Sequence, residues 1–207
     1  MRRTMEESGT NNRREFFESI GFDPSCVARS EQVHGNNVRF VEIAGNYPST
    51  DAMVTTRQHL LLTISVADCV PVLLFDNKSG ASAAIHAGWR GTEKRIVSHT
   101  LDYMTKEIHC NLEDVLAFVG PCAGVCCYEV GDEVVRNFPE EFSVWKGESG
   151  KYNLDLKRLN FTQLIEGGVP EDNIEISPAC TIHDENFHSF RRDGTASGRM
   201  LAVIGLK

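Results

Sequence analysis

Residues 60–91, LLLTISVADCVPVLLFDNKSGASAAIHAGWRG, contain three apolar segments that decide the fold class of this chain. The segments Leu61–Ser65, Val70–Phe75 and Ala81–His86 have the length of strands, and short polar turns separate them. Their β-branched and apolar content is too continuous for a sheet with one face in water. We therefore expect a sheet that is covered on both faces.

The rest of the chain contains both helical and strand patterns. Between Thr92 and Ile108, apolar residues recur at a spacing of about 3.6, which is typical of an amphipathic helix. The order of elements favours an α/β chain of the α+β type, with a layered mixed sheet, over a Rossmann fold. No GxGxxG or Walker loop follows any strand, so nucleotide-phosphate cradles of those types are excluded. The other predicted helices run from Asn11 or Asn12 to Ile20, over Gly131–Phe138 and over Asp155–Glu166, and the other predicted strands are Val38–Ile43, Ala52–Thr55, Val115–Val119, Ile174–Ser177 and Met200–Leu206.

Length and composition are those of one globular domain. The 207 residues are 41% hydrophobic and 24% charged, and neither a long linker nor a repeat divides them. Residues 1–10, MRRTMEESGT, are polar and are expected to form a flexible N-terminus. Residues 11–207 are expected to form a single domain.

Charge and hydropathy exclude two classes of partner. The formal net charge is −8 without a basic stripe, whereas a protein that binds duplex nucleic acid normally carries one. The longest apolar runs stop well short of the roughly 20 residues that a membrane span needs. Arg2, Arg3, Glu6 and Glu7 stand where a signal peptide would be apolar. We therefore expect a cytoplasmic protein without nucleic-acid or membrane partners.

The seven cysteines of such a chain are expected to stay reduced, as core residues, metal ligands or nucleophiles. No CxxC pair faces a second one, so a closed zinc site of four cysteines is not expected. Cys126 and Cys127 are adjacent and would normally point in different directions, which makes them poor joint ligands of one metal ion. For Cys122, Cys126 and Cys127 we favour a structural role.

Polar, reactive side chains concentrate in three segments beside predicted strands. A reactive group at a strand end, followed by glycines and the start of a helix, leaves room for a substrate and for backbone N–H groups that bind an anion. The three segments are QVHG at residues 32–35, ADCVP at residues 67–71 and HAGWRG at residues 86–91.

Two imidazoles and one thiol in these segments suggest a metal site at His34, Cys69 and His86. A catalytic zinc ion typically keeps three protein ligands and a fourth position for water. The ion would lower the pKa of that water towards about 7 and so provide a nucleophile. Asp68, next to Cys69, is expected to orient a ligand or to carry protons.

Each of these residues also has a structural interpretation. His34 can be a turn histidine, Cys69 a small buried residue at a strand start, and His86 a histidine satisfied in the core. Trp89 and Arg90 can form a stacked surface pair. A further alternative uses Cys69 as a nucleophile and His86 as its base, in a metal-free hydrolase or deamidase. The residues alone leave these alternatives open.

Five motifs, in the same order along the chain, resemble the YfiH family. That family is catalogued as multicopper polyphenol oxidoreductase (laccase) and contains the FAMIN-type purine nucleoside enzymes. The resemblance runs from about Asn12 to the C-terminus. The motifs are QVHG at 32–35, ADCVPVLLFD at 67–76, HAGWRG at 86–91, GPCAGVCCYEVG at 120–131 and FHSFRRDGTASGRM at 187–200.

The resemblance implies a YfiH-like catalytic domain with a layered α/β fold, shared with bacterial toxin deamidases, and a zinc site at His34, Cys69 and His86. It further implies cleavage of adenosine, inosine, guanosine and methylthioadenosine by phosphate, and hydrolytic deamination of adenosine. A purine nucleoside and phosphate are thus the expected partners, and zinc is the expected metal, with copper as the less favoured alternative. The oligomeric state stays open.

Phosphorolysis requires a phosphate site, for which Arg90 beside a helix start is the candidate and Arg191, Arg192 or Arg199 are alternatives. A solvated basic loop is an equal interpretation of these three alternatives. Tyr128 and Glu129 are expected to pack against or touch the base. The expected site residues are Cys69, His86, Asp68 and Arg90 for catalysis, Arg90, Tyr128, Arg191 and Arg192 for substrate binding, and His34, Cys69 and His86 for the metal.

Two further activities come with the resemblance, namely polyphenol oxidation and the removal of a wrongly added amino acid from a peptidoglycan precursor. A blue-copper laccase needs several histidine-rich sites, and seven scattered histidines without an HxH pair do not supply them. Members of the family usually carry some tens of residues before the matching part, with a Phe-Ser-Thr-Arg type segment and a Gly-rich stretch. That segment is expected to build part of the substrate pocket, and nothing in this chain corresponds to it.

Overall fold

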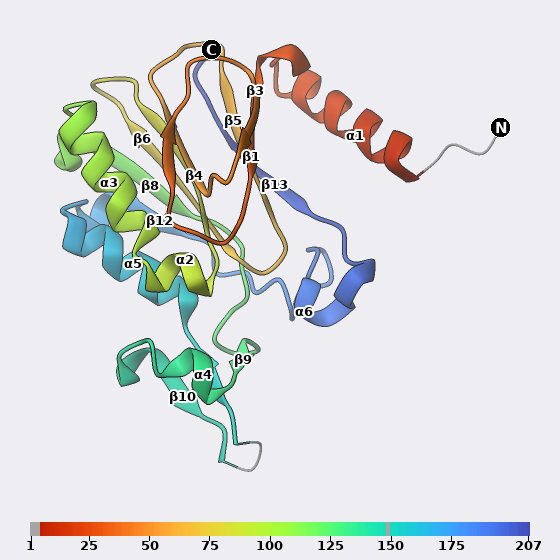
Figure 1. Ribbon diagram of the computed structural model, residues 1–207, viewed down its shortest axis with the longest axis vertical. Coiled ribbons are helices and arrows are strands. Elements are labelled where there is room, and N and C mark those ends of the chain that lie inside the picture. The colour runs from red at the N-terminus through yellow and green to blue at the C-terminus, as the bar shows by residue number, and fades with distance from the viewer. Residues whose placement is uncertain (1–4, 148–149) are drawn as a thin grey trace.

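A six-stranded mixed sheet lies at the centre of the protein, as the computed structural model of residues 5–147 and 150–207 shows (Figure 1). Its central strands β6 and β7 pair antiparallel through a turn that the carboxylate of Asp76 holds closed. This carboxylate accepts hydrogen bonds from the backbone N–H of Lys78, at 2.8 Å, and from the hydroxyl of Ser79, at 2.6 Å. The strands in spatial order are β12 (Ile174–Ile176), β8 (Val115–Val119), β6 (Val70–Asp76), β7 (Ser82–Ala87), β4 (Ala52–Thr55) and β2 (Val38–Phe40).

A second, four-stranded sheet packs against one face of the central sheet. Met53, Leu62, Ile64 and Ala84 are buried between the two sheets, where apolar side chains from both layers meet. Because β4 and β7 are buried along their whole length, the prediction of a sheet covered on both faces is confirmed. The strands of this sheet in spatial order are β13 (Met200–Ile204), β5 (Leu61–Val66), β1 (Val27–Glu31) and β3 (Gly45–Pro48).

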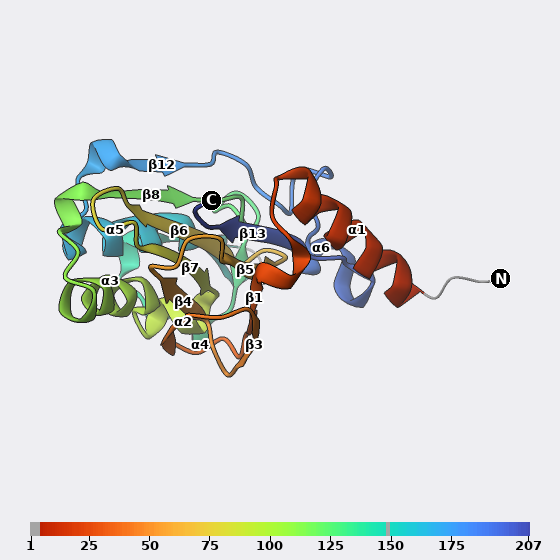
Figure 2. The same ribbon diagram turned by 90° about the horizontal axis from the view of Figure 1, so that it is seen from above.

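Helices α3 (Ile96–Glu107) and α5 (Leu156–Gly167) cover the other face of the central sheet (Figures 1 and 2). Helix α5 begins where predicted, because the side chain of Asp155 accepts a hydrogen bond from the backbone N–H of Arg158 at 2.9 Å. Gly168, with φ of 106°, ends it. The predicted layered α/β architecture with mixed sheets is therefore confirmed.

A helix is confirmed within the predicted range Thr92–Ile108, but it begins later than predicted, because the chain forms two helices there. Helix α2 (Trp89–Glu93) ends at Lys94, and Arg95 takes the left-handed conformation, with φ of 58°, before α3 begins. Thr92 ties α2 to α5, because its hydroxyl accepts a hydrogen bond from the side-chain amide of Asn160 at 3.0 Å. The break in the helix thus lets α2 pack separately above β7 and α5.

Several short elements differ from the predictions. Helix α1 (Met5–Ser19) begins before the predicted Asn11 or Asn12, and α4 (Asp132–Val135) is shorter than predicted. The structure also contains a small sheet of β9 (Glu129–Val130), β10 (Ser143–Trp145) and β11 (Tyr152–Leu154), and a short helix α6 (Phe190–Asp193). These elements and the strands β1 and β3 were not predicted, because their segments are short and partly polar. No helix within residues 5–147 and 150–207 is long and apolar enough to cross a membrane.

Leu62→Ala should lower the free energy of unfolding by about 2–5 kcal/mol, because it removes buried methyl groups between the two sheets and leaves a cavity. Leu116→Ala on β8 is the matched control, since that side chain is 45% exposed, and we expect a change within about 0.5 kcal/mol. Urea denaturation of both variants measures the difference. Equal losses would contradict the layer assignment.

Candidate functional site

Two histidines and one cysteine, His34, Cys69 and His86, converge at one end of the two sheets. Their ligand atoms lie within 4.8 Å of one another, and the two imidazole rings are nearly perpendicular with centroids 4.8 Å apart. Ligand atoms lie about 2.0–2.3 Å from a bound zinc ion, so one ion fits between these three donors. His34 is exposed, Cys69 half-buried and His86 buried, so the group opens to solvent on the side of His34.

The strands explain why these three residues meet. Cys69 stands in the turn between β5 and β6, and His86 lies near the end of β7, opposite Pro71 in the antiparallel pair. His34 follows β1 and has a left-handed backbone with φ of 58°. A Cβ atom at Gly88 would lie 3.0 Å from both the sulfur of Cys69 and a ring carbon of His34, so glycine allows these two side chains to approach without a shift.

The buried carboxylate of Asp51 holds both histidine-bearing segments. It accepts backbone hydrogen bonds from the N–H groups of His34, at 3.0 Å, and Gly35, at 2.7 Å. Its Oδ1 also lies 2.9 Å from Nδ1 of His86. An ionised carboxylate only accepts hydrogen bonds, so Nδ1 donates to Asp51. Nε2 is then the nitrogen that would bind a metal ion, once the ion displaces its proton. The donor set therefore fits a zinc ion.

Hydrogen bonds within this cluster shift the pKa values of Cys69 and His86. Burial disfavours the thiolate, but hydrogen bonds from His34 and His86 outweigh it and lower the pKa of Cys69 to about 6. Burial likewise opposes the imidazolium, but hydrogen bonds to Asp51 and Cys69 raise the pKa of His86 to about 9. The sulfur is thus prepared to act as a thiolate.

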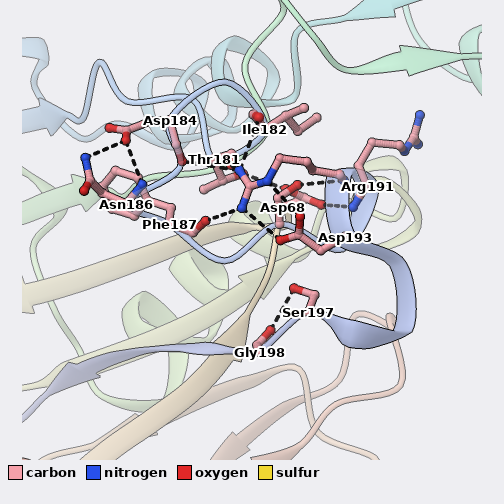
Figure 3. A network of polar contacts seen from close by, with 12 residues as sticks. Asp68, Thr181, Ile182, Asp184, Asn186, Phe187, Arg191, Asp193, Ser197 and Gly198 are labelled. Carbon is pink, nitrogen blue, oxygen red and sulfur yellow. Dashed lines mark hydrogen bonds and ion pairs between the residues drawn. The ribbon is translucent and has the colours of Figure 1, made fainter.

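The side chain of Asp68 binds a loop, and not one of the three predicted metal ligands. Its buried carboxylate accepts hydrogen bonds from the hydroxyl of Thr181, at 2.7 Å, and the backbone N–H of Arg191, at 2.6 Å (Figure 3). The contact to a histidine of the cluster that we expected from Asp68 is made by Asp51, and proton transfer by Asp68 stays a prediction. Sequence reasoning missed Asp51, and the available signal was a carboxylate placed directly before the apolar run Ala52–Val54.

A pocket of about 530 Å³ opens beside the histidine–cysteine cluster. Tyr128 and Arg191 form part of its wall, as the substrate-binding prediction requires. The guanidinium of Arg191 lies over the Tyr128 ring, 5.0 Å from its centroid, and donates a hydrogen bond to the carbonyl of Glu129. The lining residues are Ser30, Gln32, His34, Ser65, Ala67, Asp68, Cys69, His86, Tyr128, Phe190, Arg191 and Arg199.

Arg90 and Arg192 lie outside this pocket. Arg90 lines a neighbouring pocket of about 740 Å³ that shares Tyr128 and Arg191 with the first, and its guanidinium stacks on Trp89 at 4.2 Å. The guanidinium of Arg192 donates to Asp193 and to backbone carbonyls of its own loop, including that of Phe187 at 2.8 Å. The guanidinium of Arg192 thus binds its own loop, and the predicted role of Arg192 in substrate binding stays a prediction.

The chain is similar to known proteins both in sequence and in structure. Residues 4–207 match the family described as multi-copper polyphenol oxidoreductase laccase. The crystal structure of the Bacillus licheniformis hypothetical protein YfiH superposes with a TM-score of 0.91 at 32% identity, over 95% of this chain and 80% of that one.

Curated relatives carry enzyme names. A Bacteroides thetaiotaomicron protein named purine nucleoside phosphorylase is 45% identical over 87% of this chain, which spans 64% of that relative's length. A protein named adenosine deaminase RL5, from an unknown prokaryotic organism, is 37% identical over 74% of this chain and 61% of its own length. The match of almost the whole sequence shows that this chain belongs to the multi-copper polyphenol oxidoreductase laccase (YfiH) family.

Proposed function

We propose that this protein is a zinc-dependent purine nucleoside phosphorylase that also deaminates adenosine. The convergence of His34, Cys69 and His86 beside a pocket carries the proposal. It is supported by relatives named purine nucleoside phosphorylase and adenosine deaminase, which share 45% and 37% of their aligned residues with this chain. Adenosine, inosine, guanosine and methylthioadenosine are the proposed substrates.

His34, Cys69 and His86 would hold the zinc ion. A bound zinc ion lowers the pKa of a coordinated water to about 7 and thereby supplies a nucleophile at neutral pH. Asp51 keeps the Nδ1 proton of His86 in place, so the ring presents Nε2 to the ligand position. The exposed position of His34 leaves this side of the cluster open to substrate.

Arg191 is the arginine best placed to bind phosphate. It lines both pockets, and its guanidinium uses one N–H group on the carbonyl of Glu129, which leaves other donors for an anion. Its neighbour Tyr128 is largely buried with one face against this guanidinium, and is proposed to contact the base. Arg90 would then act from the adjoining pocket.

A metal-free hydrolase is a second candidate, because the pKa of Cys69 is lowered by His34 and His86 and this favours a thiolate nucleophile. In that mechanism His86 would hold the proton that the thiol releases. Chelators and thiol reagents distinguish the two candidates.

Cys69→Ala and His86→Ala should abolish both zinc binding and product formation from adenosine, with and without phosphate, because each removes one of three ligands. Mass spectrometry of metal content and chromatography of nucleosides measure the two effects. Cys26→Ala is the matched control, since that thiol lies outside the cluster. Turnover that resists chelation but is lost on thiol alkylation would instead establish the metal-free mechanism.

Asp51→Asn should lower zinc affinity by about 10–100-fold, because the amide cannot accept all the hydrogen bonds that now orient His34 and His86. Asp68→Asn is the control and should keep the wild-type affinity, since its carboxylate contacts Thr181 and Arg191 instead. Competition with a chromophoric chelator gives both constants. Unchanged affinity in Asp51→Asn would refute the orienting role.

Arg191→Ala should raise the KM for phosphate in phosphorolysis by roughly tenfold or more, because a charge-assisted hydrogen bond to the anion is lost. Deamination of adenosine consumes no phosphate and should keep its rate. Arg39→Ala, an exposed change on β2, is the control. A phosphate KM equal to that of the control would remove Arg191 from the phosphate site.

A further inference from the structure

Three cysteine sulfurs form a second cluster, at Cys126, Cys127 and Cys180. Their Sγ atoms lie within 4.8 Å of one another, and none of the three belongs to the histidine–cysteine site. The expectation that the adjacent side chains of Cys126 and Cys127 point in different directions does not hold here, because their sulfurs lie close together. The reason is a tight turn, in which the backbone N–H of Cys127 donates to the carbonyl of Gly124 at 3.0 Å.

Backbone pairing brings the third sulfur to this turn from a distant part of the sequence. Cys180 lies on the segment between β12 and α6, and a β-bridge joins it to Cys122. The backbone N–H of Thr181 donates to the carbonyl of Cys122 at 3.0 Å. The two loops are thus held side by side, and their cysteine side chains meet over Gly124.

Gly124 is the residue that permits the close approach of the sulfurs. A Cβ atom there would lie 3.2 Å from the sulfurs of both Cys126 and Cys180, a separation that few side chains tolerate. Its backbone N–H donates to the sulfur of Cys180 at 3.2 Å, which favours the thiolate form. The turn therefore provides both the space and a polar contact for a charged sulfur.

The donor set indicates the class of ligand. Three sulfurs without an imidazole or carboxylate select soft ions with a filled d shell, such as Cu(I) and Zn(II), over Mg²⁺ or Ca²⁺. Cys126 is exposed, and the other two cysteines are half-buried, so an ion can enter from solvent and keep an open position.

We propose that Cys126, Cys127 and Cys180 form a second metal site, which binds one thiophilic ion, Cu(I) or Zn(II). The ion links the loop that carries Tyr128 to the segment that leads to Phe190 and Arg191. These residues line the pocket beside the first cluster, so the second ion holds two walls of that pocket together.

Metal titration of the reduced Cys69→Ala protein under anaerobic conditions tests the site without any assay of activity. This variant lacks a ligand of the first site, so the expected result is one bound equivalent of Cu(I) or Zn(II) per chain, measured against a competing chelator. Cys126→Ser should lower that affinity by at least about 100-fold and Cys180→Ser similarly, because each removes one of three ligands.

Cys26→Ser in the same background is the matched control and should leave the affinity unchanged, since that thiol lies in neither cluster. Binding of only one of the two ions would support the site and identify its metal. Absence of a bound equivalent of either ion would overturn the proposal. Equal affinity in the Cys126→Ser and control proteins would overturn it too, and since Cys126 is exposed this variant is expected to fold.

Discussion

The carboxylate of Asp51 is fully buried, and the geometry of the histidine–cysteine site depends on the hydrogen bonds that it accepts. Backbone N–H groups of Val33, His34 and Gly35 and the imidazole of His86 surround its two oxygens. A buried charge is tolerated only when such donors compensate for lost hydration. Separating the Asp51 carboxylate from these donors would require a large free energy. The turn after β1 and the end of β7 are therefore fixed relative to one another.

The two packed sheets place this carboxylate where it is needed. Asp51 directly precedes β4, which pairs antiparallel with β7, and its own carbonyl accepts a hydrogen bond from the backbone N–H of His86 at 2.7 Å. The turn after β1 belongs to the other sheet. Gln32 fixes that turn, because its side-chain amide exchanges hydrogen bonds of 2.8 and 2.7 Å with the backbone of Ser65 on β5. The site thus forms where strands of both sheets end.

Loops from the second half of the chain complete the pocket. The carboxylate of Asp68, beside Cys69, accepts hydrogen bonds from the hydroxyl of Thr181 and from the backbone N–H of Arg191 (Figure 3). These bonds attach the second half of the chain to the first. On the same segment, Cys180 meets the turn at Cys126 and Cys127. One segment therefore contacts the β5–β6 turn, the loop before β9 and the pocket. This arrangement explains how residues that lie far apart in the sequence line one pocket.

The sequence by itself determined the central strands and the residues of the first cluster. Continuous apolar segments such as Val70–Phe75 encode burial locally, and the family motifs single out His34, Cys69 and His86, which the structure brings together. Only the tertiary structure decided the role of Asp51, the meeting of Cys126 and Cys127 with Cys180, and the engagement of Arg192 by its own loop. Each of these depends on hydrogen bonds or on backbone direction in folded turns, and side-chain direction in a turn follows from φ and ψ rather than from residue type.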